Sequence, residues 1–301
     1  LKPAPESALP EPPPGPAAAA DIDRTPKFYI GGKQARPDSG YSRAVLSPSG
    51  ELLGQVGEGN RKDIRNAVEA AAGAESWSRT SSHNRAQVMY YIAENLEARA
   101  GEFAARIAAQ TGSGKRSARR EVDSSISRLF SYAGWADKFD GRTHATPMRG
   151  ITLSVHEPRG VMGIACSREF PLLGFVSLVA PAIAMGNRVV MIPSEVHPLS
   201  ALDMYQVFDT SDLPGGVVNI ICGRRDALAL VLAEHYNVDA VWYRGTAEGS
   251  KAVEAASAAS LKATWVDHGR RCDFMDPQQG EGRDYLRAAT EVKTIWAPYG
   301  E

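Results

Sequence analysis

Residues 161–192, VMGIACSREFPLLGFVSLVAPAIAMGNRVVMI, form the stretch that decides the fold of this chain. Two short apolar runs, Val161–Cys166 and Arg188–Ile192, lie on either side of a longer apolar segment that Pro171 and Pro181 interrupt. The short runs favour buried strands, and the longer segment favours a buried helix because it falls short of the roughly 20 residues of a bilayer span. The stretch therefore predicts a strand–helix–strand unit of a buried parallel sheet.

The same alternation of strand and helix continues toward the carboxyl end. Further strands are predicted at Val217–Cys222, Ala240–Tyr243 and Lys262–Val266, and helices at Leu199–Phe208, Arg225–Ala233 and Ala247–Ala259. Short apolar strands separated by helices of this length imply a parallel sheet that is covered on both faces. The predicted fold class is α/β, with a doubly wound, Rossmann-like parallel sheet at its centre.

The chain before this stretch begins with a tether. Residues 1–25 hold seven prolines and four consecutive alanines, a composition typical of an extended linker. Because the chain starts at Leu1 without a signal peptide, we expect a piece of a longer protein with another domain upstream. Short hairpin strands are predicted within Lys27–Val56. Helices are predicted at Lys62–Ala72, at Arg85–Thr111 with Asn84 or Ser82 as its cap, and at Arg116–Phe139.

Charge and cysteine content limit the classes of partner. The 301 residues carry a net charge of −1, which argues against electrostatic binding of nucleic acid or an anionic membrane. The three cysteines are widely spaced and form neither a zinc pattern nor a disulfide framework. A reducing compartment, the cytoplasm, is therefore expected, and no metal site is predicted.

Several segments, in the same order, resemble signatures of the aldehyde dehydrogenase superfamily. They are Tyr132–Lys138 (YAGWADK), Glu157–Gly163 (EPRGVMG), Phe170–Leu172 (FPL), Pro193–Glu195 (PSE), Leu213–Asn219 (LPGGVVN), and Val238-Asp239 followed by Gly245-Thr246. One such match would be weak, but a collinear set over nearly everything after the tether is specific. The proline-rich lead and the closing Glu291–Thr294 most resemble the second half of aldehyde dehydrogenase family 16, which carries two dehydrogenase-like units in tandem.

The resemblance implies a particular domain organisation. Residues 26–275 would form a domain of the coenzyme-binding type, with bridging strands over residues 143–157, and residues 276–301 would supply a terminal bridging or oligomerisation strand. The family's separate catalytic domain, with its cysteine, is expected to be missing. The segment Glu291–Pro298 alternates in the manner of a strand, and we expect it to pair with a neighbouring unit rather than to fold back onto its own core.

The resemblance also identifies two vestigial catalytic positions. Glu169 stands where the family has the asparagine that donates to the oxyanion, and an ionised carboxylate cannot donate. Asp267 stands at the position of the general base but is one methylene shorter than the family's glutamate. Cys272 lies five residues later and is expected to be a small, buried or half-buried residue rather than a nucleophile.

The nucleotide site implied by the resemblance is altered as well. Its vestigial positions are Ile192, Ser194, Glu195, Arg225, Gly245 and Ser250. Ile192 replaces a lysine that contacts the ribose, Arg225 replaces a glycine under the adenine, and Ser250 replaces a glycine of the pyrophosphate turn. Glu195 keeps a carboxylate for a ribose hydroxyl, and Gly249 is a glycine displaced by one position. These changes predict that no cofactor is bound tightly, with weak NAD(P) binding left open.

Two other patterns are expected to be structural. Gly112–Lys115 (GSGK) lacks the spacing of a phosphate-binding loop. The basic cluster of Lys115, Arg116, Arg119 and Arg120 is followed at once by Glu121 and Asp123, and it predicts a solvated helix face.

The sequence favours a non-catalytic domain, a pseudoenzyme that serves as an assembly scaffold within a longer tandem protein. Its partner would be a second copy, in a homodimer, or an upstream aldehyde dehydrogenase-like domain, with other proteins also open. The alternative is NAD(P)-dependent aldehyde oxidation with a nucleophile supplied by another domain or chain, and a third reading is a nucleotide-binding regulatory module.

Overall fold

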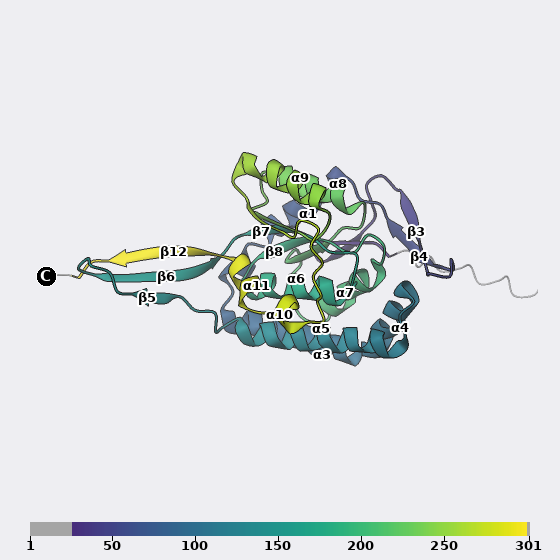
Figure 1. Ribbon diagram of the computed structural model, residues 1–301, viewed down its shortest axis with the longest axis horizontal. Helices are drawn as coiled ribbons and strands as arrows, with labels where there is room; N and C mark the ends of the chain where they lie inside the picture. Colours follow the sequence, from purple (N-terminus) through teal and green to yellow (C-terminus); the bar gives the residue numbers. More distant parts are fainter. Residues whose placement is uncertain (1–25, 300–301) are drawn as a thin grey trace, which may run out of the picture.

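A seven-stranded sheet forms the centre of the computed structural model, which describes residues 26–299 (Figure 1). The strand order is β11-β10-β7-β8-β9-β1-β2. The strands are β1 (Phe28–Ile30), β2 (Lys33–Ala35), β7 (Val161–Ala165), β8 (Arg188–Ile192), β9 (Val218–Ile220), β10 (Ala240–Tyr243) and β11 (Ala263–Val266). The pairs from β11 to β9 are parallel, and β1 and β2 add antiparallel strands at one edge. The predicted α/β class is confirmed, while the tether of residues 1–25 lies outside the described residues.

The middle strand of the sheet marks a change in the direction of winding. From β7 the chain adds β8 and β9 on one side, and it then crosses back to add β10 and β11 on the other. In register, Ile164 of β7 lies between Met191 of β8 and Trp242 of β10. Ligands of open α/β sheets bind beyond the carboxyl ends of the strands at such a switch point. The topology therefore predicts a ligand site at the segments that follow β7 and β10.

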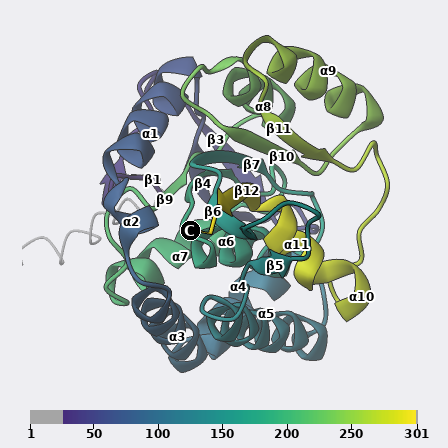
Figure 2. The same ribbon diagram turned by 90° about the vertical axis from the view of Figure 1, so that its left-hand side faces the viewer.

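Helices cover both faces of the sheet (Figure 2). One face carries α1 (Arg61–Gly73), α8 (Arg225–Glu234) and α9 (Ala247–Ser257); the other carries α3 (Ser82–Ala98), α5 (Lys115–Trp135), α6 (Leu173–Ala184) and α7 (Leu199–Asp209). Every residue of α6 is buried, because α6 lies between the sheet and the helices α3 and α5. A helix that is apolar on all sides is the expected occupant of such a layer.

Two predictions about the long helical region are wrong. The single helix predicted at Arg85–Thr111 is split into α3 and α4 (Ala100–Thr111), because Arg99 has the non-helical backbone angles φ −108° and ψ 11°. Neither Asn84 nor Ser82 caps α3: the hydroxyl of Ser81 accepts from the backbone N–H of Asn84 at 3.2 Å. The break allows α4 to contact α7.

A three-stranded antiparallel sheet projects from the body, and we call it the arm (Figure 1). Its strands are β5 (Arg142–His144), β6 (Ile151–Pro158) and β12 (Thr290–Ala297), in the order β12-β6-β5. Pairing runs from Thr290 opposite Pro158 to Ala297 opposite Ile151. The bridging strands expected over residues 143–157 correspond to β5 and β6, which a turn separates. The end segment does not pack onto the core, and its pairing with a neighbour stays a prediction.

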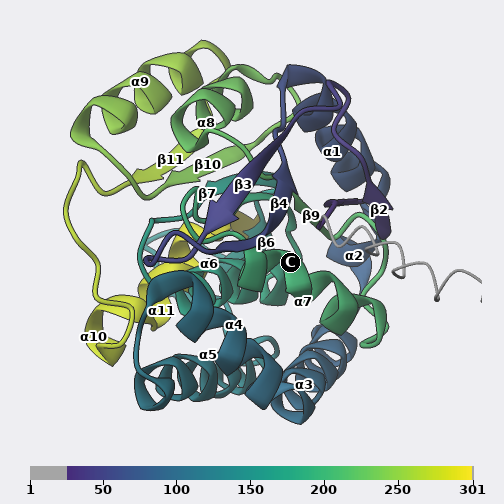
Figure 3. The same cartoon turned by 90° about the vertical axis from the view of Figure 1, so that its right-hand side faces the viewer.

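The remaining elements are small. A hairpin of β3 (Ser42–Leu46) and β4 (Leu52–Gly57) lies at the end of the body opposite the arm (Figures 1 and 3). The short helices α2 (Ser76–Arg79), α10 (Pro277–Gly280) and α11 (Arg283–Ala288) complete the chain, together with a 3₁₀ turn η1 (Ala258–Ser260) after α9. No helix within residues 26–299 has both the length and the hydrophobicity that a membrane span requires.

Candidate functional site

A cavity of about 230 Å³ lies at the switch point, and we call it the cleft. It is lined by the segments that follow β7, β10 and β11 and by the start of α8. The lining residues are Ser167, Arg168, Glu169, Arg225, Arg244, Gly245, Thr246, Asp267, Gly269, Arg270, Arg271 and Cys272. The cleft thus brings together both vestigial catalytic positions, Cys272, and two of the nucleotide-site positions.

Glu169 is engaged in an ion pair. Its Oε2 accepts from Nε of Arg271 at 2.7 Å, and the carboxylate raises the pKa of the Arg271 guanidinium through this hydrogen bond. Both side chains are partly exposed, so the pair contributes little stability. Its chemical consequence is larger, because Glu169 supplies no donor at the oxyanion position and ties up a cation beside it. The sequence did not predict Arg271 as its partner.

Asp267 holds the backbone of the cleft together. Its Oδ1 accepts from the N–H groups of Gly245 and Gly269, both at 3.2 Å. These bonds link the turn after β11 to the turn after β10. The oxygen at the position of the family's general base is thus an acceptor for two amides, and Asp267 has a structural role in joining the two turns.

Ser194 and Glu195 likewise bond to protein groups. The hydroxyl of Ser194 donates to the carbonyl of Arg168 at 3.0 Å and accepts from the N–H of His197 at 3.2 Å. Glu195 accepts from the N–H of Arg225 at 3.3 Å. Ile192 is fully buried at the end of β8, so its side chain offers nothing to a ribose. The first half of the predicted nucleotide site therefore connects loops to one another.

Arg225 lies buried at the start of α8, at the position that the family resemblance assigns to the floor under an adenine. Only 3% of the residue is exposed, and its Nε donates to Oδ1 of Asp226 at 2.9 Å. A second nitrogen donates to the carbonyl of Arg244 at 3.2 Å, and the guanidinium lies 5.4 Å from the ring centre of Tyr243. These three contacts hold the side chain of Arg225 in place, and its exclusion of an adenine stays a prediction.

Tyr243, the last residue of β10, occupies the turn that would face a pyrophosphate. Its hydroxyl donates to Oδ1 of Asp226 at 2.7 Å and accepts from the N–H of Thr246 at 3.2 Å. A Cβ atom added at Gly249 would lie 2.0 Å from this oxygen, and one added at Gly245 would lie 2.4 Å from it. Both glycines are therefore needed to accommodate Tyr243. The displaced Gly249 was the sequence signal for a bulky neighbour.

Three amides around the start of α9, those of Gly245, Thr246 and Gly249, donate to side chains of the protein. Besides the Thr246 amide, the N–H of Gly249 donates to Oγ1 of Thr246 at 2.9 Å, and the N–H of Gly245 donates to Asp267. Ser250 is fully buried; its hydroxyl donates to the carbonyl of Thr246 at 2.9 Å and accepts from the N–H of His268 at 3.1 Å. A phosphate at this helix start would have to displace these bonds.

None of the three thiols is activated. Burial raises the pKa of Cys166 and of Cys222 to about 12. Cys272 is half-buried beside the hydroxyl of Tyr285 and the carbonyl of Gln279, and burial raises its pKa as well. A nucleophilic cysteine needs the opposite shift, toward the thiolate. The expectation that Cys272 is a buried or half-buried residue agrees with its exposure, and its lack of a nucleophilic role stays a prediction.

The other sequence patterns are structural where the chain is described. Gly112 adopts φ 70° as the residue that ends α4, so Gly112–Lys115 is a connection between two helices. The basic cluster at the start of α5 is exposed, and Arg119 pairs with Asp123 at 2.7 Å. Among the described residues, no three His, Cys, Asp or Glu side chains gather in a metal-binding group.

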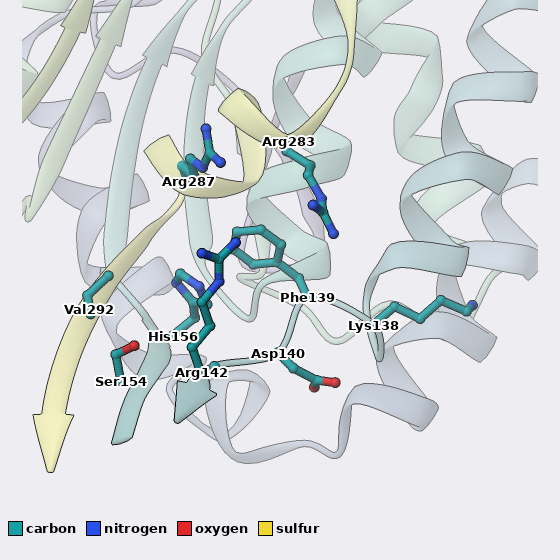
Figure 4. Close-up of a pocket in the computed structure, with 10 residues that line it drawn as sticks. Lys138, Phe139, Asp140, Arg142, Ser154, His156, Arg283, Arg287 and Val292 are labelled. Carbon is teal, nitrogen blue, oxygen red and sulfur yellow. The ribbon is translucent and has the colours of Figure 1, made fainter. Parts of the chain in front are cut away.

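A second hollow, of about 410 Å³, lies where the arm joins the body and was not predicted (Figure 4). Arg283 and Arg287 extend from α11 above it, and Arg142 lies beside His156 (Figure 4). Burial, together with the charges of Arg142 and Arg287, lowers the pKa of His156. Arg287 pairs with Asp284 at 3.0 Å, and Arg283 stacks on Trp135 at 4.9 Å. Arg283 and Arg287 therefore already contact protein groups, and Arg142 is exposed to solvent.

Comparison with known proteins gives the family. Residues 36–271 match the model of the aldehyde dehydrogenase family. The chain is 34% identical over 255 residues to the mitochondrial benzaldehyde dehydrogenase of Antirrhinum majus, covering 83% of this chain and 48% of that protein. It is 33% identical over 252 residues to retinaldehyde dehydrogenase 3 of Rattus norvegicus, covering 81% and 49%. The chain thus spans about half the length of these curated relatives.

Solved structures agree. An NAD-dependent aldehyde dehydrogenase from Sinorhizobium meliloti superposes with a TM-score of 0.78 at 29% identity, over 82% of this chain and 50% of that chain. Betaine aldehyde dehydrogenase from Staphylococcus aureus in complex with NAD+ gives a TM-score of 0.77 at 26% identity, over 81% and 49%. From the family match, the sequence identities and the fold, the chain belongs to the aldehyde dehydrogenase family.

Proposed function

We propose that this chain is a non-catalytic aldehyde dehydrogenase-like unit that assembles, through its arm, with another unit of the same fold. One observation carries the proposal. The groups of the cleft that would meet a coenzyme or an oxyanion are bonded to one another: Tyr243 to the turn of α9, Glu169 to Arg271, and Asp267 to two amides.

The expected loss of catalysis is large. Removal of a single oxyanion donor costs on the order of a hundred- to a thousand-fold in rate. Here a carboxylate, Glu169, replaces the donor, and the thiols of the chain have pKa values above that of an ordinary cysteine. Both effects act on the same chemical step, so they support a unit that does not turn over aldehydes by itself.

The arm supports the assembly role. β12 forms one edge of its sheet, and an exposed edge strand is a template for pairing with another chain. Large apolar side chains are exposed on the same structure. They are Met148, Ile151, Val292, Ile295 and Trp296, each between 40% and 60% exposed. Strand addition uses the free backbone groups for affinity and alternate side chains for specificity, so a second strand of the same kind is the fitting occupant.

The assembly role is tested with a charged substitution on the arm. Trp296→Glu places a charge on the exposed face of β12 and is expected to convert a dimer of this chain into a monomer, measured by light scattering over a range of concentrations. The matched control is Leu261→Glu, which changes a 93% exposed leucine outside the arm and should leave the dimer intact. A wild-type chain that is monomeric at high concentration, or a Trp296→Glu variant that still dimerises, would refute self-assembly through the arm.

The second candidate is NAD(P)-dependent oxidation of aldehydes, with the nucleophile supplied by another domain or chain. Family membership and the similarity to an NAD-dependent enzyme favour it. Incubation of the chain with NAD and a panel of aldehydes separates the two. We expect no production of NADH, whereas steady production that Cys272→Ser abolishes would make this an enzyme. The free thiols fit a reducing compartment such as the cytoplasm.

A further inference from the structure

The cleft is strongly basic for its size. Five arginines line it, against the two carboxylates of Glu169 and Asp267. Arg271 is paired with Glu169, and Arg225 is paired with Asp226. The carboxylate of Asp267 accepts hydrogen bonds from the N–H groups of Gly245 and Gly269. The remaining three arginines, Arg168, Arg244 and Arg270, form no ion pair within residues 26–299.

Arg244 differs from an ordinary surface arginine, because it is buried and water cannot compensate for its missing counter-charge. The residue is only 6% exposed, and its guanidinium lies 4.1 Å from the ring centre of Trp265. Its buried Nε has no hydrogen-bond partner among the described residues. A buried donor without a partner and a buried charge without a counter-charge both destabilise a fold. An arrangement of this kind is consistent with a partner group that the protein does not itself supply.

The chemistry of the missing group follows from the arginine. A guanidinium presents parallel N–H donors that match the two oxygens of a carboxylate or of a phosphate. Glu169 illustrates this pairing at the rim of the cleft, where its carboxylate binds Arg271. The cavity of about 230 Å³ is smaller than the roughly 300–1,000 Å³ of pockets for drug-sized ligands, so the occupant is small.

We propose that the cleft binds a small oxyanion, a carboxylate or a phosphate monoester, with Arg244 as its buried anchor and Arg168 and Arg270 at its rim. The ligand would be held on the side of the cleft away from the turn that Tyr243 fills, and no coenzyme is required. The site does not depend on assembly through the arm, because none of its residues belongs to β5, β6 or β12.

The first test uses inorganic phosphate and succinate as probes for the two sources of oxyanion. The melting temperature of the 301-residue chain should rise with the concentration of at least one probe, relative to sodium chloride of equal ionic strength, since a ligand of the native state stabilises it. A stronger effect of phosphate indicates a phosphoryl group, and a stronger effect of succinate indicates a carboxylate. If neither probe exceeds sodium chloride, the proposal is overturned.

Substitution of Arg244 makes the test specific. Arg244→Met should reduce the affinity for the effective probe by about 30-fold or more, because it removes one partner of a buried charge pair. Without the probe, this variant should be at least as stable as the wild type, since it removes an unpaired buried charge. The matched control is Arg120→Met, which changes an exposed arginine of α5 outside the cleft. Equal probe binding by wild type and Arg244→Met would contradict the assignment.

A second variant and an NMR measurement on the wild type test the role of Arg244 if Arg244→Met fails to fold. Arg244→Lys keeps the charge but loses the parallel donors, so it should fold and bind the probe more weakly than the wild type. In the wild-type protein, the Nε–H resonance of Arg244 should shift on addition of the effective probe. A resonance that stays in place at saturating probe would overturn the role of Arg244.

Discussion

The cleft and the arm differ in whether their interacting groups already have partners within the chain. In the cleft, side chains from segments far apart in the sequence satisfy one another, as Glu169 and Arg271 do across 102 positions. In the arm, β12 leaves one backbone edge free and exposes Val292, Ile295 and Trp296 to solvent. The comparison shows which region of the fold has free backbone groups and which region has its polar groups bonded within the protein. Here the free strand edge belongs to the arm, while the hydroxyl of Tyr243 is bonded to groups on both sides of the turn that precedes α9.

The largest effect is expected from overpacking the closed turn. Gly249→Ala places a Cβ atom 2.0 Å from the hydroxyl of Tyr243 in a region that is already filled. We expect a loss of about 3 kcal/mol in the free energy of unfolding, the upper range for an overpacked core, measured by urea denaturation. The control is Gly101→Ala in α4, where no atom lies within 4 Å and the better helix propensity should stabilise. An unchanged stability of Gly249→Ala would mean that Tyr243 does not fill the turn in solution.

A smaller effect tests the hydrogen bonds of the same tyrosine. Tyr243→Phe removes the acceptor of the Thr246 amide and the donor to Asp226, which should cost about 1–2 kcal/mol. Tyr236→Phe is the control, because Tyr236 is 85% exposed and should change stability by less than about 0.5 kcal/mol. If the two variants were equally stable, the closure of the turn would rest on packing alone.

Alkaline pH gives this variant a second readout. Burial, and then the hydrogen bond to Asp226, raise the pKa of Tyr243 above its ordinary value of 10.0. The stabilisation linked to this group is complete below pH 10 and is lost as the pH rises toward the folded-state pKa. Tyr243→Phe should therefore lose less stability than the wild type as the pH rises above about 10. A steeper alkaline loss in the variant would contradict this linkage.

The smallest effect concerns the junction of the arm with the body. Burial and the charges of Arg142 and Arg287 lower the pKa of His156 below 6.5. The unfolded chain then binds more protons near that pH, so the contribution of His156 is present above pH 6.5 and is lost as the pH falls through its folded-state pKa. His156→Gln should flatten the decline in melting temperature toward pH 5. His83→Gln, on the exposed start of α3, should leave that decline unchanged.

The order of elements around the sheet could be predicted because their apolar pattern is local. Strands β7 and β8 and helix α6 lie close to the predicted ranges, since each is buried along its full length. The bridging strands over residues 143–157 were located through the family resemblance, because alternation looks the same in one strand and in two, and the turn between β5 and β6 is marked only by Pro147 and Gly150. The break at Arg99 was missed because its neighbours continue the helical spacing.

The candidate site was predictable only one residue at a time. The family resemblance located Glu169, Asp267 and Arg225, and all three lie around the cleft. Their partners could not be read from the sequence, because the contact of Glu169 with Arg271 depends on how separate loops meet. The role of Tyr243 was not predicted because aromatic residues are common in strands and usually pack in the core. The unpaired Nε of Arg244 could not be predicted because it depends on how the side chains pack in the folded structure.

Hydrogen exchange followed by mass spectrometry tests the central contrast in one experiment, on the wild-type chain at low and high concentration and with or without NAD. The amides of Gly245, Thr246 and Gly249 should be protected without NAD and should not change when it is added, because Asp267, Tyr243 and Thr246 already accept from them. The amides of residues 290–297 should gain protection as the concentration rises, as a second strand covers the free edge of β12. Protection of residues 245–249 that appears only with NAD, together with an arm that does not respond to concentration, would contradict the account.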